Sequence, residues 1–200
     1  MFTGIVESLA KVIKVAKDDD FVQLLLEFPE EISSNSLGDS ICINGVCLTV
    51  ARISDRSLIG FDVIEETLNK TNISSLKIND LVNVERSMSV GGRIEGHILQ
   101  GHVEGVAKIV EKKQKGTNLR MSLEVPNGLI KYCVEKGSIS LDGVSLTIAS
   151  IKNNFVEVAL IPYTLEKTTL GIKGISETLN VETDILGKYI YNMMQKYEKI

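Results

Sequence analysis

The sequence has 200 residues, 44% of them hydrophobic and 24% charged, which is typical of a globular protein and excludes wholesale disorder. Its 22 Lys and Arg against 26 Asp and Glu give a net charge of −4 without any basic run, which argues against nucleic-acid binding. No stretch approaches the roughly 18 apolar residues of a membrane span, and residues 1–15 lack the apolar block of a signal peptide, so we expect a cytoplasmic protein whose three cysteines are reduced.

An internal repeat dominates the chain. Four blocks recur in the same order with a shift of 97 or 98: 1–12 with 98–109, 40–50 with 138–148, 66–73 with 163–170, and 81–85 with 178–182. This order is the signature of a tandem duplication. We therefore expect two domains, 1–96 and 97–184, followed by a separate tail, 185–200.

Within each copy the hydrophobic period is two, as in strands. Runs such as VQLLLEF at 22–28 and FVEVALI at 155–161 alternate between short Gly, Asn and Asp turns. Many short strands with regular turn signals indicate a small barrel or sandwich, and two all-β barrels of about 90 residues are the simplest outcome. The TLxKT segments near residues 67 and 164 are the expected helical interruptions, of one or two turns.

The block at 40–50 and its repeat at 138–148 predict two β-hairpins. Asn44-Gly45 and Asp142-Gly143 favour two-residue type I′ turns, because both central residues need positive φ. Alternation then puts apolar residues on one face: Ile41, Ile43, Val46, Leu48 and Val50 in the first copy, and Ile139, Leu141, Val144, Leu146 and Ile148 in the second. The other face carries small polar residues: Ser40, Cys42, Cys47 and Thr49, and Ser138, Ser140, Ser145 and Thr147.

This polar face has two interpretations. A strand of any barrel can turn polar residues to solvent. A row of small hydroxyls and thiols, however, also suits a flat, hydrogen-bonding ligand lying against the sheet, and we favour this second interpretation. A β-bulge would change the pairing, but it would leave Cys47 with Thr49 and Ser145 with Thr147 on one face.

The two copies differ at a few chemically active positions. Cys47 is matched by Ser145, Ile5 by His102, Asp62 by Ala159 and Ser87 by Asp184. Specialised halves of a composite site would produce these differences, and so would drift. The two histidines stand in GHILQGH at 96–102, and no Cys/His cluster supplies the three or four ligands of a metal site. No glycine-rich nucleotide motif or GxSxG elbow occurs either.

The tail carries the only long helical pattern. Apolar residues recur there at three- and four-residue spacing: Ile185, Leu186, Tyr189, Ile190, Met193, Met194, Tyr197 and Ile200. This stripe either packs back on the barrels or forms a contact between subunits, and we favour the subunit contact.

Several of these blocks together resemble the riboflavin synthase family, over about residues 1–190. They are MFTGIVE at the start, NGVCLTV and DGVSLTI, GHILQGH, and LIPYTLEKTTL at 160–170. The resemblance implies two six-stranded Greek-key barrels and a C-terminal helix that holds a homotrimer. It implies a transferase that dismutates two molecules of 6,7-dimethyl-8-ribityllumazine into riboflavin and 5-amino-6-ribitylaminouracil by moving a four-carbon unit, without a cofactor. It leaves open an association with lumazine synthase.

The resemblance also implies site residues, with one lumazine on each barrel and the working site between barrels of neighbouring subunits. For the first barrel these are Gly4, Ile5, Val6, Cys47, Leu48, Thr49, Asp62, Val63, Ile64, Glu65, Glu66 and Thr67. For the second they are Gly101, His102, Val103, Lys136, Ser145, Leu146, Thr147, Ile161, Pro162, Tyr163, Thr164, Leu165 and Glu166. Ser40 and Asp184 match positions near the reacting rings.

The implied roles follow from side-chain chemistry. His102 is the candidate base, Cys47 would add to C7 of a lumazine or orient a water, and Ser145 would hydrogen-bond the ring edge. Asp184 is the fourth catalytic candidate. The main alternative is a chromophore protein that binds lumazine or flavin without chemistry, but both histidines and Cys47 are present. A flavin-dependent oxidoreductase would need a further nucleotide-binding domain, and a ligand-free adaptor is the remaining option.

Overall fold

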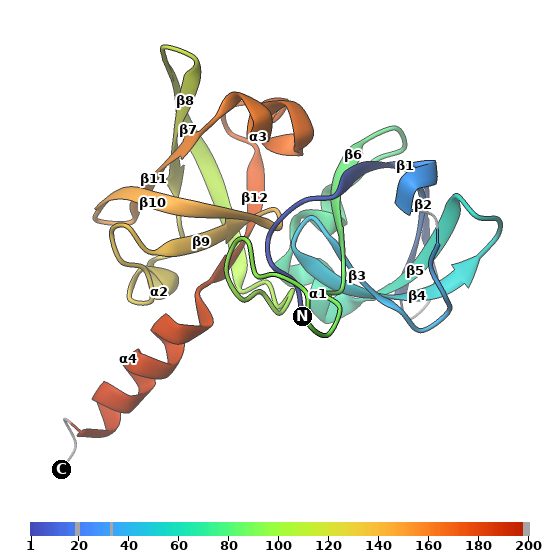
Figure 1. Cartoon of the computed structure of the whole chain (residues 1–200), viewed down its shortest axis with the longest axis horizontal. Coiled ribbons are helices and arrows are strands. Elements are labelled where there is room, and N and C mark those ends of the chain that lie inside the picture. Colours follow the sequence, from blue (N-terminus) through green and yellow to red (C-terminus); the bar gives the residue numbers. More distant parts are fainter. Residues whose placement is uncertain (19–20, 33, 198–200) are drawn as a thin grey trace.

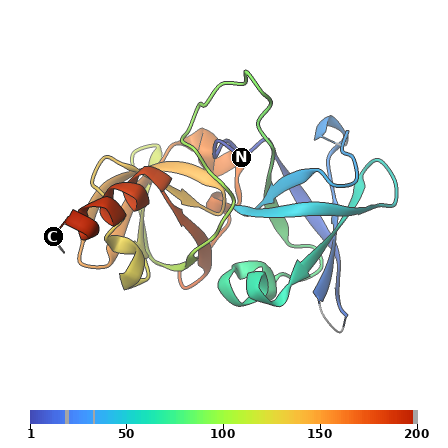
Figure 2. The same ribbon diagram turned by 90° about the horizontal axis from the view of Figure 1, so that it is seen from below.

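The computed structural model describes residues 1–18, 21–32 and 34–197. It contains two closed antiparallel barrels side by side, with the C-terminal helix extending from the second one (Figures 1 and 2). The first barrel is built from β1 Ser8–Lys17, β2 Phe21–Glu27, β3 Ser40–Ile43, β4 Val46–Ile53, β5 Leu58–Ile64 and β6 Leu81–Arg86. The second is built from β7 Gly105–Lys115, β8 Asn118–Glu124, β9 Ser138–Leu141, β10 Val144–Lys152, β11 Phe155–Leu160 and β12 Thr178–Thr183.

The two barrels have the same topology. Around the first barrel the strands run β1-β2-β5-β4-β3-β6, and the second closes in the corresponding order. Each barrel encloses its own cluster of buried apolar side chains, contributed by alternate residues of its strands. The expected fold, two tandem six-stranded barrels and a terminal helix, is confirmed.

Short helices interrupt the strands in matching places. They are η1 Glu30–Ile32, α1 Glu65–Lys70, η2 Asn72–Ser75, α2 Asn127–Ile130, α3 Pro162–Lys167 and η3 Thr169–Gly171. The TLxKT segments form α1 and α3, as predicted. In the described part of the chain no helix is long and apolar enough to cross a membrane.

Both hairpins adopt the predicted register. Cys42 pairs with Cys47 across the first turn, and Ser140 pairs with Ser145 across the second. The central turn residues have positive φ, 45° at Asn44 and 46° at Asp142, as type I′ turns require.

The two turns meet tip to tip where the barrels touch. A Cβ added to Gly45 would lie 2.7 Å from the backbone nitrogen of Gly143, so only glycine allows this approach. Cys42 of β3 and Ser140 of β9 are only 2% and 1% exposed. This corrects the expected continuous polar face, because these two members are buried and not open to a ligand, whereas Cys47 and Ser145 opposite them are partly exposed.

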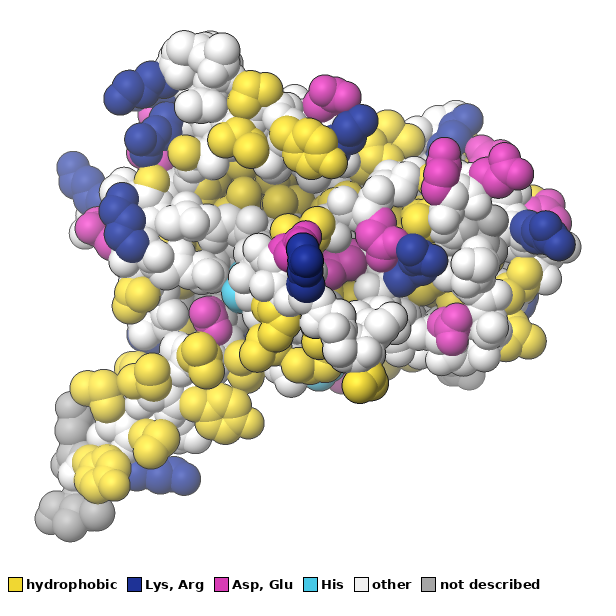
Figure 3. Space-filling model, in the orientation of Figure 1, with side chains coloured by type: hydrophobic (Ala, Val, Ile, Leu, Met, Phe, Trp, Pro, Cys, Tyr) yellow, Lys and Arg dark blue, Asp and Glu magenta, His cyan; other side chains and the backbone are white. Residues whose placement is uncertain are grey.

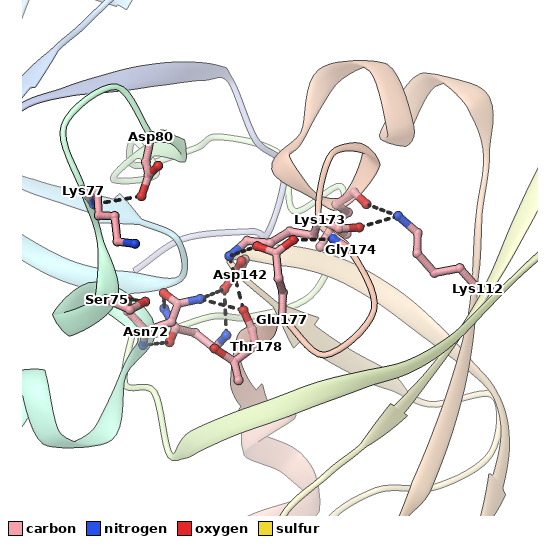
Figure 4. A network of polar contacts seen from close by, with 12 residues as sticks. Asn72, Ser75, Lys77, Asp80, Lys112, Asp142, Lys173, Gly174, Glu177 and Thr178 are labelled. Carbon is pink, nitrogen blue, oxygen red and sulfur yellow. Dashed lines mark hydrogen bonds and ion pairs between the residues drawn. The ribbon is translucent and has the colours of Figure 1, made fainter.

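Side-chain amides of both barrels form hydrogen bonds across this junction. Asn83 of β6 donates to the backbone oxygen of Asp142 at 2.8 Å, and Asn180 of β12 donates to that of Asn44 at 2.7 Å. Asn72 of η2 reaches across from the first barrel and donates to the Asp142 carboxylate at 2.9 Å (Figure 4). Buried amides paired in this way fix the orientation of the barrels, since each bond is lost if the barrels separate.

The segments that precede each barrel cross over to the other one. Phe2 and Leu99 form an antiparallel bridge, with N–O distances of 2.8 and 3.0 Å. Beyond this bridge, the backbone N–H of Ser145 donates to Gly4 O at 2.8 Å, and that of Cys47 donates to Gly101 O at 2.9 Å. The N-terminal segment therefore pairs with the second barrel, and the segment that opens the second copy pairs with the first barrel.

Helix α4, Ile185–Tyr197, contacts the second barrel through its first two turns. A Cβ on Gly187 would lie 2.6 Å from Tyr132 O, and the Tyr132 and Tyr191 rings meet edge to face at 5.4 Å. The rest of the apolar stripe projects from the molecule as the yellow arm in Figure 3. The alternative in which the helix packs back on the barrels is therefore wrong. Ile200 lies outside the described residues.

Candidate active site

A cavity of about 260 Å³ lies where the first hairpin meets the crossing segment of the second copy. It is lined by Val46, Cys47, Glu66, Thr67, Lys70, Thr71, Gly101, His102 and Val103. The cavity therefore combines a thiol, an imidazole, the side chains of α1 and the backbone of a glycine turn. We refer to it as the first half-site.

Gly101 makes this arrangement possible. It has φ of +75°, and a Cβ there would lie only 2.6 Å from the Cβ of Cys47. The turn is held by the carboxylate of Glu182, which accepts backbone N–H groups from Gln100 at 2.8 Å, Gly101 at 2.9 Å and His102 at 3.2 Å. Burial raises the pKa of Glu182, while these donors act in the opposite direction.

His102 and Val103 lie with the first barrel, and this corrects the expected grouping. The family resemblance implied that Gly101, His102 and Val103 serve the second barrel, to which they belong in chain order. In the structure Val103 packs against the core of the first barrel, and Val6 packs against that of the second. The cause is the crossing at Phe2 and Leu99, which no local sequence pattern indicates.

The second half-site is the counterpart of the first, built around Ser145 of β10. Gly4, with φ of +79°, approaches it so closely that a Cβ would lie 2.5 Å from the Cβ of Ser145. The carboxylate of Glu85 accepts the backbone N–H groups of Thr3 at 2.6 Å and Gly4 at 3.0 Å, as Glu182 does in the first half-site. Gly4 therefore belongs with the second barrel, and the expectation that placed it with the first is corrected.

His97 also belongs to the second half-site, which the sequence alone does not indicate. Its side chain is 8% exposed, and Nδ1 lies 2.6 Å from the Oγ of Ser145. Burial lowers the pKa of His97, and the charge of Asp184 opposes this effect. The sequence signal was the pairing of both histidines in GHILQGH, but only the fold shows that they serve different half-sites.

The other predicted contact residues differ in how far their side chains are exposed. The side chains of Leu48, Val63 and Leu146 are buried in the barrel cores. Ile64, Ile161 and Tyr163, in contrast, are apolar and exposed to solvent.

Two charged candidates, Asp62 and Lys136, already have partners within the chain. Asp62 is paired with Arg52 on the outer face of β4 and β5, and the Nζ of Lys136 donates to Ala149 O at 3.2 Å. The remaining members of the two segments are the α1 residue Glu65 and the α3 residues Pro162, Thr164, Leu165 and Glu166.

Ser40 and Asp184 lie apart from the Cys47–His102 cavity. Ser40 lines a larger cavity of about 500 Å³ that also includes Ile5 and Glu85. Asp184 lines a groove of about 330 Å³ at the root of α4, and its Oδ1 accepts the backbone N–H of Leu186 at 3.0 Å. Thr49 and Thr147 are exposed on the outer faces of β4 and β10. Within the described ranges no group of three His, Cys, Asp or Glu side chains is placed to hold a metal ion.

Comparisons with known proteins agree with this duplicated architecture. A lumazine binding domain model matches residues 3–87 and 100–184. The riboflavin synthase of Actinobacillus pleuropneumoniae is 38% identical over 98% of this chain and 91% of its own length. That of Bacillus subtilis is 37% identical with the same coverage.

Solved structures of LumP have the same fold. The crystal structure of LumP with riboflavin has a TM-score of 0.85 at 30% identity, and covers 92% of this chain and 99% of that one. The complex of LumP with 6,7-dimethyl-8-(1′-D-ribityl)lumazine has a TM-score of 0.83 at 28% identity, with the same coverage.

Proposed function

The chain belongs to the riboflavin synthase family, and on this premise we propose that it converts two molecules of 6,7-dimethyl-8-ribityllumazine into riboflavin and 5-amino-6-ribitylaminouracil. One observation carries the proposal. The chain builds the same kind of half-site twice, each from a hairpin of one barrel and a glycine turn held by a buried glutamate. A reaction between two copies of one substrate needs two such sites.

For this reaction the protein mainly has to position the two substrates. The C7 methyl group of the lumazine is acidic, because its carbanion delocalises into the ring. One molecule loses this proton, the other is attacked at C7, and a four-carbon unit moves across the joined intermediate. Holding two planar substrates face to face converts a bimolecular encounter into an effectively intramolecular reaction.

The side chains of the two half-sites then have distinct roles. Cys47 adds to C7 of the lumazine in the first half-site or orients a water there, and His102 beside it transfers protons. Ser145 hydrogen-bonds the lumazine in the second half-site. The glycine turns at Gly4 and Gly101, with Ile5, Val6 and Val103 next to them, offer close approach of backbone to the rings. Thr49 and Thr147 hydrogen-bond the outer edges.

We propose that the two half-sites meet in a homotrimer. In one chain Cys47 and Ser145 lie on different barrels that join at their turns, so each half-site faces outward. A neighbouring subunit would bring its second half-site, with Asp184, to the first half-site and Ser40 of this one. The exposed stripe of α4 is the surface that would hold the subunits together.

This division assigns functions to three parts of the chain. Residues 1–96 and 97–184 are the two lumazine-binding units, and residues 185–200 are the trimer contact. We place the protein in the cytoplasm, which is consistent with three free thiols at Cys42, Cys47 and Cys133. Copurification with lumazine synthase tests the association that the family resemblance leaves open.

Incubating the purified protein with the lumazine alone tests the proposal. Riboflavin fluorescence should rise while two lumazines disappear per riboflavin formed, with the uracil product appearing in equal amount. A protein that binds lumazine tightly without forming riboflavin would instead be a chromophore protein like LumP, whose solved complexes hold the same ligands. Failure to bind either compound would refute both functions.

A further inference from the structure

The contact between His97 and Ser145 has no equivalent in the first half-site. His97 lies immediately before the repeated block that begins at residue 98. It enters the second half-site with its backbone N–H donating to Thr3 O at 3.1 Å, and its ring reaches the Ser145 hydroxyl at 2.6 Å. Cys47, the counterpart of Ser145, instead packs beside the apolar cluster of Phe2, Leu99 and Cys42.

The other ring nitrogen of His97 is unusual. Nε2 is buried and has no hydrogen-bond partner among the residues that the structure describes. Buried polar atoms are nearly always paired, and an orphaned N–H is rarer than an orphaned acceptor. The favoured free state therefore keeps the proton on Nδ1, which donates it to Ser145 Oγ and leaves the serine proton free to point into the half-site.

A tautomer shift reverses the polarity of this pair. With the proton on Nε2, Nδ1 accepts the serine proton, and Ser145 Oγ becomes the acceptor of any proton delivered from the half-site. Burial lowers the pKa of His97 and so favours the neutral ring, while the negative charge of Asp184 acts in the opposite direction. A buried ring with one strong partner and one free nitrogen therefore holds an added proton only for a short time before returning it.

We propose that His97 is a positioning residue that orients Ser145 and stores the proton removed from the substrate in the second half-site. The proposal rests on the proposed function. From the tautomer with the proton on Nε2, the C7-methyl C–H bond of that lumazine breaks, its proton passes to Ser145 Oγ, and the serine proton passes to the free Nδ1 of His97, which leaves the ring protonated on both nitrogens. The electron pair stays on the substrate and delocalises into the ring. Nothing is oxidised or reduced, and the reverse transfer returns the proton later.

In this assignment the two histidines have different roles. The Ser145–His97 pair makes the carbanion in the second half-site. His102 and Cys47 act on the lumazine that is attacked in the first half-site. The difference between Cys47 and Ser145 at matched positions is then functional and not drift.

A double-mutant cycle in the full-length protein tests the proposal. His97→Asn keeps a hydrogen-bonding group near the position of Nδ1 but cannot accept the proton. We expect it to lower kcat by about 10²-fold or more, the usual range for proton-transfer catalysis, with KM changed less than threefold. In a Ser145→Ala background the same change should alter kcat by no more than about threefold, because coupled residues are not additive. Equal losses in both backgrounds would overturn the proposal.

Deuterium exchange gives a measurement that would not change if His97 had only a structural role. In D₂O the wild-type protein should speed exchange of the lumazine C7 methyl, followed by proton NMR, and His97→Asn should lose this acceleration while still binding lumazine. Cys47→Ser is the matched control, since it alters the other half-site and should keep the exchange. Unchanged exchange in His97→Asn would refute the proton role. A wild-type protein that forms no riboflavin would instead refute the proposed function.

Discussion

At the scale of single residues, Asp142 is a point where the two copies differ in charge. Its counterpart Asn44 is neutral, whereas Asp142 carries a carboxylate into the junction between the barrels. Oδ1 accepts the N–H of Asn180 at 2.7 Å and the amide of Asn72 at 2.9 Å. Oδ2 has no partner among the described residues. Burial raises the pKa of Asp142 to about 6, while the nearby Lys173 opposes the shift.

This pKa makes the folded protein less stable as the pH rises. An aspartate of the unfolded chain titrates near 3.8, so between that pH and about 6 the folded form retains a proton that the unfolded form has lost. Above pH 6 Asp142→Asn should therefore raise the free energy of unfolding, on the order of 2 kcal/mol. Below pH 4 the substitution should have little effect. Thermal melts at pH 4 and pH 7.5 measure this, and a variant less stable at pH 7.5 would contradict it.

Substitution of Cys47 tests whether its thiol takes part in the reaction. Cys47→Ser keeps a hydrogen-bonding group in the first half-site but supplies a poorer nucleophile. Turnover should fall at least about tenfold, which corresponds to about 1.4 kcal/mol of lost transition-state stabilisation, while lumazine still binds. Cys133→Ser, outside both half-sites, is the control. Steady-state assays with lumazine titrations check the result, and near-normal turnover in Cys47→Ser would leave the thiol only a packing role.

At the scale of elements, the hairpins and α4 show what a sequence reveals. The register around Asn44 and Asp142 was predictable, because a two-residue turn with positive φ fixes which residues of the two strands pair. The apolar stripe of α4 was predictable from its period. The crossing of the segments around Gly4 and Gly101 was not, because it depends on how two folded barrels sit together. For the same reason His97 was missed and His102 was placed with the wrong barrel.

Removal of α4 should separate the subunits. Six apolar residues of this helix are more than half exposed in the single chain: Leu186 61%, Tyr189 65%, Ile190 59%, Met193 58%, Met194 57% and Tyr197 73%. Each would contribute about 1.5–3 kcal/mol if fully buried. A chain that stops after Gly187 loses five of the six, all except Leu186, and should therefore be monomeric by light scattering and lose turnover, while circular dichroism shows intact barrels. A monomer with full activity would refute the shared site, and a persistent trimer would refute the role of α4.

At the scale of the whole molecule, the proposed site belongs to two chains. If so, two impaired variants should rescue each other. A Cys47→Ala subunit keeps its second half-site and a Ser145→Ala subunit keeps its first, so mixed trimers contain some intact sites. Random assortment of equal amounts predicts roughly one quarter of the sites. Activity after mixing, unfolding and refolding together measures this, with each variant refolded alone as control. No recovery would place the whole site within one chain.

The crossing of the two segments also sets an order in time. The bonds of Gly4 to Ser145 and of Gly101 to Cys47 join each barrel to the segment that leads into the other one, so each forms on a barrel that has already folded. Contacts between residues distant in sequence form slowly, because the intervening chain must first be ordered. We therefore expect the ligand sites to be completed late in folding. During refolding with riboflavin present, circular dichroism should recover first, and quenching of the flavin fluorescence should follow as a slower phase.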